Sequence, residues 1–340
     1  MSRSCIGTVV VFGAVAAATC GCRHAAERPM VVVYTSVDQV HSEPVLKAFE
    51  AASGITVLPI YDVEATKTTG LANRLLAEKS KPRADVWWNG EFAQTLALKR
   101  HGVLAAYRPP TMADLPPESA DPEGFWAAVG GRARVLLVNT DLVAKADYPR
   151  GIRDLLDPKW GKGQALLAQP LFGTTATEAA ALYAWMGPDA ALEFYRAVAR
   201  SGVRVVDGNS VVRDLVAAGQ AKVGMTDTDD AQGAIERGAP VKAILPDQND
   251  RGTLVIPGTV ALVAGGPHPD QGKALVDFLT GPEAEGLLMK SGFCQIPLHA
   301  NSPVPQWLGV SRIRRMQVSF DDVCGNLERA RRDLREVFLR

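Results

Sequence analysis

Short apolar runs of strand length recur in the first third of the chain, and segments with helical spacing of apolar residues separate them. The runs cover residues 30–34, 55–61 and 84–88, and the first has three valines in succession. An apolar run without alternation is typical of a strand buried on both faces of a parallel sheet. Residues 43–52 and 71–78 have the helical spacing. The pattern therefore predicts a βαβαβ unit and an α/β fold.

Polar side chains follow each of these predicted strands. In open α/β sheets the ligand lies beyond the carboxyl ends of the strands, where the following loops converge. We therefore expect a ligand-binding site at this edge of the sheet. Its candidate residues are Thr35, Ser36 and Asp38 after the first strand, Glu64, Lys67 and Thr68 after the second, and Asn89 and Glu91 after the third.

A second set of strand and helix patterns occupies the middle of the chain, between long apolar strands predicted at 125–138 and 253–263. Two long strands that cross between lobes would form a hinge. We predict two lobes, each a mainly parallel sheet flanked by helices. The predicted boundaries are 30–130 with 258–300 for lobe 1, 131–257 for lobe 2, and 301–340 for a helical tail that packs on lobe 1. The polar loop residues of lobe 2 are Thr174, Thr175 and Asn209.

The most polar strand end is the sequence Thr-Asp-Thr-Asp-Asp at residues 226–230, between an apolar approach at 221–225 and a predicted helix at 232–237. A single such residue is enough to cap the helix, which is the alternative to a binding role. A run of hydroxyl and carboxylate groups favours a wall of the ligand site. The residues expected to form that wall are Thr226, Asp227, Thr228 and Asp229.

Composition and charge limit the classes of partner. The chain has 340 residues, of which 47% are hydrophobic and 22% charged, enough for a large core divided between two domains. Lysine plus arginine and aspartate plus glutamate both number 37, so the formal net charge is zero. A balanced charge offers no surface for a polyanion, and we expect no nucleic-acid partner.

The N-terminus has the pattern of a secretion signal. Arg3 precedes an almost unbroken run of apolar and small residues, Ile6–Thr19, which is short for a membrane span. Cys22 follows Gly21 after this run and resembles the processing site of a bacterial lipoprotein, with plain cleavage nearby as the alternative. We therefore expect residues 1–22 to be a signal segment, Cys22 to carry lipid, and the mature chain to work in the periplasm or cell envelope, an oxidising compartment.

Two cysteines, Cys294 and Cys324, remain in the predicted mature chain. An even number in an oxidising compartment is compatible with a disulfide that ties the tail to the body. Cysteine is also among the most frequently buried residue types, so two buried free thiols are the alternative. The sequence has no CxxC pair and no Cys/His cluster typical of a zinc site.

Motifs spread over about residues 30–300 carry a family resemblance. They are Val32–Ser36, Ala84–Trp88, Trp126–Asn139 with its Arg132 and Arg134, Leu155–Trp160, Gly266–Pro269 and Leu279–Glu283. Together they resemble the extracytoplasmic solute-binding proteins of ABC importers, in the branch that contains the ferric-ion-binding proteins. The resemblance implies the type 2 periplasmic-binding-protein fold. It also implies that an open cleft captures a solute, closes over it and docks on a membrane permease.

The ferric-ion-binding branch usually holds iron with a His after the first strand, a Glu after the third and two adjacent Tyr in the second lobe. The matching positions here are Asp38, Glu91 after a one-residue shift, and the pair Thr228 and Asp229. The resemblance thus implies iron(III) or another hard cation, with Asp38, Glu91 and Asp229 as candidate metal ligands. Carboxylates suit such cations.

The missing tyrosines leave a phosphorylated or polar organic solute as the alternative: a sugar phosphate, a phosphonate or thiamine. The residues expected to hold a phosphate are Lys67, Arg132, Thr174 and Thr175. Arg132 and Arg134 lie two apart on a predicted strand and share a face, so we expect one of them to pair with a structural carboxylate. The histidines at 41, 101, 268 and 299 lack ligand spacing, and we expect them at the surface.

Enzyme motifs are missing from the sequence: it has no GxSxG, no HExxH, no GxGxxG after a strand and no P-loop. We therefore predict a binding protein without catalytic activity or cofactor, which works as a monomer with a small-molecule or ion ligand, an inner-membrane permease and a lipid anchor. The alternatives from other classes are a metal-dependent hydrolase built on Asp227, Asp229 and Asp230, and a purely structural lipoprotein.

Overall fold

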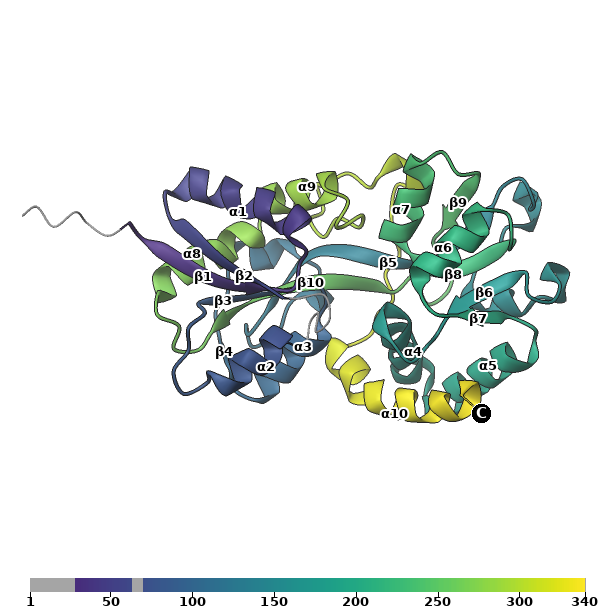
Figure 1. The fold of residues 1–340 in the computed structure, drawn as a ribbon, viewed down its shortest axis with the longest axis horizontal. Coiled ribbons are helices and arrows are strands. Elements are labelled where there is room, and N and C mark those ends of the chain that lie inside the picture. Colours follow the sequence, from purple (N-terminus) through teal and green to yellow (C-terminus); the bar gives the residue numbers. More distant parts are fainter. Residues whose placement is uncertain (1–27, 63–69, 340) are drawn as a thin grey trace, which may run out of the picture.

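A computed structural model describes residues 28–62 and 70–339, which form two α/β lobes joined by a pair of long strands (Figure 1). The strand order is β2-β1-β3-β10-β5-β8-β6-β7, with β4 beside β10 and β9 beside β5. No helix within these ranges is both long and apolar enough to span a bilayer.

Lobe 1 is built on three parallel strands. β1 (Met30–Thr35) pairs on one side with β2 (Thr56–Tyr61) and on the other with β3 (Val86–Asn89). The side chains of β3 are buried on both faces, as the unbroken apolar run predicts. A two-residue strand, β4 (Leu104–Ala105), completes this half. The helices around it are α1 (Gln39–Ser53), α2 (Gly70–Ala77), α3 (Ala93–Arg100), α8 (Pro269–Leu279) and α9 (Pro282–Lys290).

Lobe 2 repeats the arrangement. β6 (Ala165–Ala168) lies parallel to both β7 (Arg204–Val206) and β8 (Val223–Asp227), and β9 (Val241–Ile244) pairs with the long strand β5 (Ala127–Asn139). Its helices are α4 (Gly173–Met186), α5 (Pro188–Arg200), α6 (Asn209–Ala217) and α7 (Thr228–Glu236). The predicted helix after the acidic stretch therefore begins four residues earlier than expected, at Thr228.

The long strands β5 (Ala127–Asn139) and β10 (Val255–Val263) connect the lobes. They run antiparallel to each other, and each also pairs with strands of a lobe: β10 with β3, and β5 with β8. Their pairing shifts register between Pro257 and Gly258. A Cβ at Gly258 would lie 2.8 Å from the carbonyl oxygen of Val129, so only glycine permits this close crossing. The two-lobed fold with two hinge strands is confirmed.

The tail corrects one prediction. Its helix α10 (Phe320–Phe338) packs mainly on α4 and α5 of lobe 2 and only by its first turns on lobe 1. The reason is the apolar stripe of the helix, which includes Val323, Ala330 and Leu334 and is buried in the same cluster as side chains of α4 and α5. The prediction identified the amphipathic helix but assigned it to the wrong lobe.

The two cysteines are free thiols. Cys294 is buried beside the hinge and Cys324 is half-buried on α10. Burial raises the pKa of each thiol to about 12. The structure therefore has two free thiols, the second of the two alternatives, and lacks the bridge between the tail and the body that the sequence left possible.

Candidate ligand-binding site

A cavity of about 350 Å³ lies between the lobes, at the carboxyl ends of the strands. Its lining comes from both lobes and from the hinge. The residues are Ser36, Asp38, His41, Gly90, Glu91, Gly292 and Phe293 of lobe 1, Arg132 of β5, and Arg213, Asp229 and Asp230 of lobe 2. A larger hollow of about 770 Å³ is bounded by the tail loops and residues 114–118 of lobe 1. We place the candidate site in the smaller cavity because charged groups of both lobes converge there.

The end of β1 supplies one wall of the cavity. Ser36 accepts a hydrogen bond from the Gly90 amide at 3.0 Å and donates one to Asn89 Oδ1. Asn89 is buried and donates to the Glu91 carbonyl at 2.6 Å. Thr35 is buried and accepts from the Val37 amide at 3.0 Å. Ser36 therefore faces the cavity, while Thr35 and Asn89, which we expected in the site, shape the loops behind it.

Asp38 and Glu91 are the carboxylates that lobe 1 contributes. Asp38 is exposed at the start of α1, and Glu91 precedes α3. Burial raises the pKa of Glu91, although hydrogen bonds from the backbone of Ala93 and Gln94 and the charge of Arg132 oppose the shift. The Glu91 carboxylate is thus partly desolvated, and a nearby positive charge would favour its ionised form.

Arg132 spans the two lobes from its position on β5. Its guanidinium donates to the Gly90 carbonyl of lobe 1 at 3.2 Å and to Asp229 Oδ2 of lobe 2 at 3.3 Å. The same group lies over the Phe293 ring, 5.8 Å from its centre. Arg132 therefore occupies the floor of the cavity, where β5 passes between the lobes.

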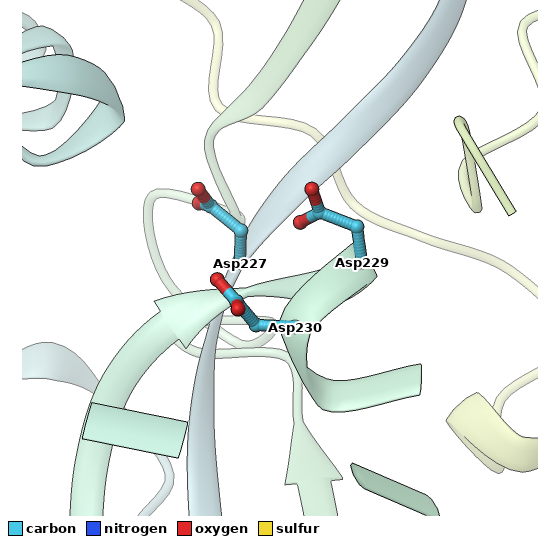
Figure 2. A group of neighbouring side chains, drawn as sticks. All are labelled: Asp227, Asp229 and Asp230. Carbon is cyan, nitrogen blue, oxygen red and sulfur yellow. The ribbon is translucent and has the colours of Figure 1, made fainter. Parts of the chain in front are cut away.

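Three carboxylates of the acidic stretch gather where β8 ends and α7 begins, and Figure 2 shows them around this junction. One oxygen from each of Asp227, Asp229 and Asp230 lies within 4.8 Å of the others. Each also has its own arginine: Arg134 at 2.8 Å from Asp227, Arg132 at 3.3 Å from Asp229 and Arg213 at 3.0 Å from Asp230. The group is therefore balanced in charge, which argues against a hydrolytic metal centre built on these three residues.

Asp227 belongs to a buried network rather than to the cavity wall. Its Oδ1 accepts from Arg134, and its Oδ2 accepts from Thr174 at 2.6 Å and Asn209 at 2.9 Å. Arg134 is fully buried and also donates to Glu178 at 3.1 Å. Burial acts to lower the pKa of its guanidinium, but the charges of Asp227 and Glu178 raise it overall. Arg134 is thus the arginine that pairs with structural carboxylates.

This network corrects four expected ligand contacts. The hydrogen-bonding groups of Thr174, Thr175, Asn209 and Asp227 are used on Arg134 and on one another. They were expected in the site because each follows a strand or opens a helix. The structure turns them inward because a fully buried guanidinium needs several acceptors.

The prediction that Thr226 and Thr228 line the site is also wrong, because both side chains are fully buried. Thr226 donates to the Asn209 carbonyl at 3.1 Å and to Asp230 Oδ2 at 3.2 Å. Thr228 donates to Gln295 of lobe 1 at 2.7 Å and accepts from the Ala133 amide at 3.0 Å. Of the four residues expected to form the wall, only Asp229 lines the cavity. The others of the predicted set, Glu64, Lys67 and Thr68, lie outside the described residues.

Comparison with known proteins gives the family. Residues 91–308 match the profile of a family described as bacterial extracellular solute-binding protein. The chain belongs to this family. Its members bind small ligands and work with ABC transporter permeases, so the protein is the extracytoplasmic solute-binding component of an ABC transporter.

Relatives and a solved structure show how wide the match is. A Salmonella typhimurium protein named "Putative 2-aminoethylphosphonate-binding periplasmic protein" is 26% identical over 265 residues, 75% of this chain and 75% of the relative. The major ferric iron-binding protein of Neisseria meningitidis serogroup B is 24% identical over 266 residues, 76% of this chain and 78% of the relative. The solved Bordetella ferric binding protein has a TM-score of 0.80 at 23% identity and covers 91% of this chain and 98% of its own.

The cavity of this solute-binding protein contains residues that the sequence did not single out. Arg213, which projects from α6, is one of them, whereas Asp230 of α7 was named only in the hydrolase alternative. His41 was expected at the surface, but it lines the cavity, where its Nδ1 lies 3.2 Å from Ser291 Oγ and its ring 5.6 Å from that of Phe293. Its position three residues after Asp38, one helical turn on, is the signal that could have identified it.

The other histidines only partly follow the surface prediction. His101 is exposed. The side chain of His299 is only 10% exposed and lies 3.2 Å from Glu285, and His268 is half-buried with its Nδ1 2.9 Å from Asp85. Pairing with a buried carboxylate draws both rings inward.

The pKa of Asp230 gives a test of the cavity's electrostatics. Burial raises it from 3.8 to about 6, and the charges of Asp229 and Asp227 act in the same direction. Because the folded-state pKa is the higher one, this group stabilises the fold below the unfolded-state pKa and loses that contribution as pH rises through about 6. The loss amounts to about 2 kcal/mol between about pH 4.5 and pH 7.

We expect Asp230→Asn to remove this dependence. Urea unfolding of both proteins at the two pH values should show that the free energy of unfolding of the wild type falls, relative to that of the variant, as pH rises. Asp214→Asn is the control, because it also removes a carboxylate that pairs with Arg213 but at an exposed position. A constant difference between wild type and Asp230→Asn would contradict the raised pKa.

Proposed function

We propose that the protein captures a small positively charged solute, iron(III) or another hard cation, in the interlobe cavity and delivers it to an inner-membrane permease. The observation that carries this proposal is the charge of the cavity lining. Four carboxylates, those of Asp38, Glu91, Asp229 and Asp230, face two guanidinium groups, which leaves an excess of negative charge. A bound cation offsets the repulsion among partly desolvated carboxylates.

Asp38, Glu91 and Asp229 are the proposed metal ligands, and all three line the cavity. Carboxylate oxygens suit hard cations. The Oδ1 atom of Asp229 is buried and accepts no hydrogen bond from the described residues, so it has a lone pair to offer. His41 adds a ring nitrogen on the same side as Asp38. The ferric iron-binding relative supports iron(III) as the first candidate.

A zwitterion with an amine and a phosphonate or phosphate group is the second candidate. Arg132 and Arg213 both line the cavity, and guanidinium groups bind such anions through paired hydrogen bonds. The carboxylates of lobe 1 would then hold the amine. The name of the Salmonella relative supports this candidate. Because Thr174 and Thr175 are used on Arg134, the anion would depend on the arginines of the cavity instead.

In the proposed mechanism the protein acts as a monomer. Its two lobes close over the solute, and the closed form then docks on the permease. Contacts between the lobes already flank the cavity: Arg132 joins Gly90 to Asp229, and Thr228 bonds to Gln295. A solute held by groups of both lobes adds to these contacts and so favours the closed form.

Native mass spectrometry and elemental analysis test the proposal, on protein purified from the envelope of the cells that naturally produce it. We expect a bound cation at about one per chain, and calorimetric binding of Fe(III) or Ca²⁺ after its removal. A bound organic phosphonate or phosphate with no metal would replace the first candidate by the second. A neutral bound solute would contradict both.

We propose that Cys22 carries a lipid that holds the protein in the periplasm on the membrane. The supporting features are the apolar segment Ile6–Thr19 and the Gly21–Cys22 pair. Cys22→Ser should release the protein into the soluble fraction of the cell envelope and leave solute binding intact. Retention of the variant on the membrane would contradict the anchor.

A further inference from the structure

Helix α10 lies on the side of the molecule away from α1 and α7 and reaches both lobes (Figure 1). Its first turn contacts lobe 1. The Phe320 ring stacks on Phe92, with 4.3 Å between centres and 20° between planes, and lies 6.1 Å from the Trp126 ring. The adjacent Asp321 lies 3.5 Å from Arg100 on α3. These contacts fix the start of the helix to lobe 1.

The remainder of α10 is attached to lobe 2. Asp333 accepts a hydrogen bond from the Tyr183 hydroxyl of α4 at 3.5 Å. Phe338 packs edge-on against Tyr195 of α5, with ring centres 6.3 Å apart. Leu334 is fully buried in the same region. One continuous helix thus has separate attachments to each lobe.

Apart from the polar ties of Asp321 and Asp333, the contacts made through α10 are apolar. A single buried cluster contains Trp87 and Phe92 of lobe 1, Leu136 and Phe194 of lobe 2, and Phe320 of α10. Separating such surfaces exposes apolar area to water, which is unfavourable roughly in proportion to that area. The lobes therefore resist separation on this side.

The contacts that meet at the cavity itself are of a different kind, although Ile296, next to Gln295, packs in an apolar cluster with residues of lobe 2. The ties of Arg132 to Gly90 and Asp229, and of Thr228 to Gln295, are hydrogen bonds at the cavity or next to it. Water can replace hydrogen-bond partners when a polar surface opens, so breaking them costs little net free energy. The two sides of the interlobe contact therefore differ in how easily they open.

We propose that α10 is a strap that stays attached to both lobes and confines opening of the protein to the polar side that contains the cavity. This inference rests on the lobe closure proposed above and adds the element that sets its direction and extent. The Phe320 contact with Phe92 and Trp126 is the attachment to lobe 1. Weakening it lets the lobes move further apart.

Distance measurements on the ligand-free protein test the strap. Spin labels introduced as noncanonical amino acids at Val40 and Val211, exposed on opposite sides of the cavity, report the separation of the lobes by double electron–electron resonance. We expect Phe320→Ala to shift the distance distribution to longer values. Phe338→Ala, which also removes one aromatic ring of α10 but on lobe 2 alone, should leave the distribution unchanged.

A second variant keeps the test valid if Phe320→Ala does not fold. Phe320→Leu keeps an apolar side chain at this position but removes the ring that stacks on Phe92, and we expect it to lengthen the distances to a smaller extent. An unchanged distribution in both Phe320 variants, or equal shifts in Phe320→Ala and Phe338→Ala, would overturn the proposal. No outcome depends on the identity of the solute, so failure of the strap is distinct from failure of the proposed function.

Discussion

We expect Asp229→Asn to weaken the binding of a cationic solute by about 1 to 3 kcal/mol, the range for a buried hydrogen bond to a charged group. Asp229 lines the cavity, and one of its oxygens is buried without a hydrogen-bond donor among the described residues. Calorimetric titration with Fe(III), Ca²⁺ and 2-aminoethylphosphonate measures the effect. Asp270→Asn is the control, because its carboxylate is 86% exposed and lies outside the cavity.

Arg132→Ala separates the two candidate solutes. For a cation, removal of this guanidinium frees Asp229 and lowers the positive potential, so the affinity is unchanged or higher. For a phosphonate, it removes a charged donor, and the affinity falls. For the Asp229→Asn variant, the contradicting result is an affinity equal to that of the wild type for every solute that the wild type binds. The acidic stretch would then serve only the fold.

We expect Arg134→Met to destabilise the protein by about 3 to 5 kcal/mol, because it leaves the buried Asp227 without its cation and Glu178 with only Arg251, 3.9 Å away. Asp227 and Glu178 are both at most 5% exposed and both pair with Arg134. Chemical unfolding at neutral pH measures the loss. Arg196→Met, on the half-exposed Arg196 of α5, is the control and should change the free energy of unfolding by less than about 0.5 kcal/mol.

A rescue variant distinguishes charge from packing in this network. Adding Asp227→Asn and Glu178→Gln to Arg134→Met removes the uncompensated charges, and we expect it to recover part of the lost stability. A loss as large as that of Arg134→Met alone would show that the guanidinium matters through its volume. A single variant that unfolds like the wild type would contradict the buried network.

The sequence predicted the lobes and the edge of the sheet well because both depend on local patterns. The apolar runs of β1 and β3 are continuous, so their carboxyl ends could be located, and Ser36, Asp38 and Glu91 follow these ends directly. The helix of the tail was also visible in its apolar spacing. Its partner was not, because the choice between lobes depends on surfaces far away in the chain.

The orientation of the acidic stretch could not be predicted from local sequence. Asp227 turns inward because Arg134, 93 residues earlier, is buried beside it. Thr228 turns inward toward Gln295, 67 residues later. Hydroxyl and carboxylate residues look alike in a strand-end pattern, whether they face a ligand or a buried arginine. Arg213 was missed for the same reason: its partner Asp230 belongs to the next helix.

The division of labour between Asp227 and its neighbours has a consequence for redesign. Within the four residues 227–230, the Asp227 carboxylate pairs with the buried Arg134, while Asp229 and Asp230 face the cavity. An engineer can therefore exchange the cavity-facing pair, together with Arg132 and Arg213, without touching the ion pair that holds the scaffold. Substitutions confined to the cavity-facing residues can thus change the solute specificity while the Arg134–Asp227 pair is kept.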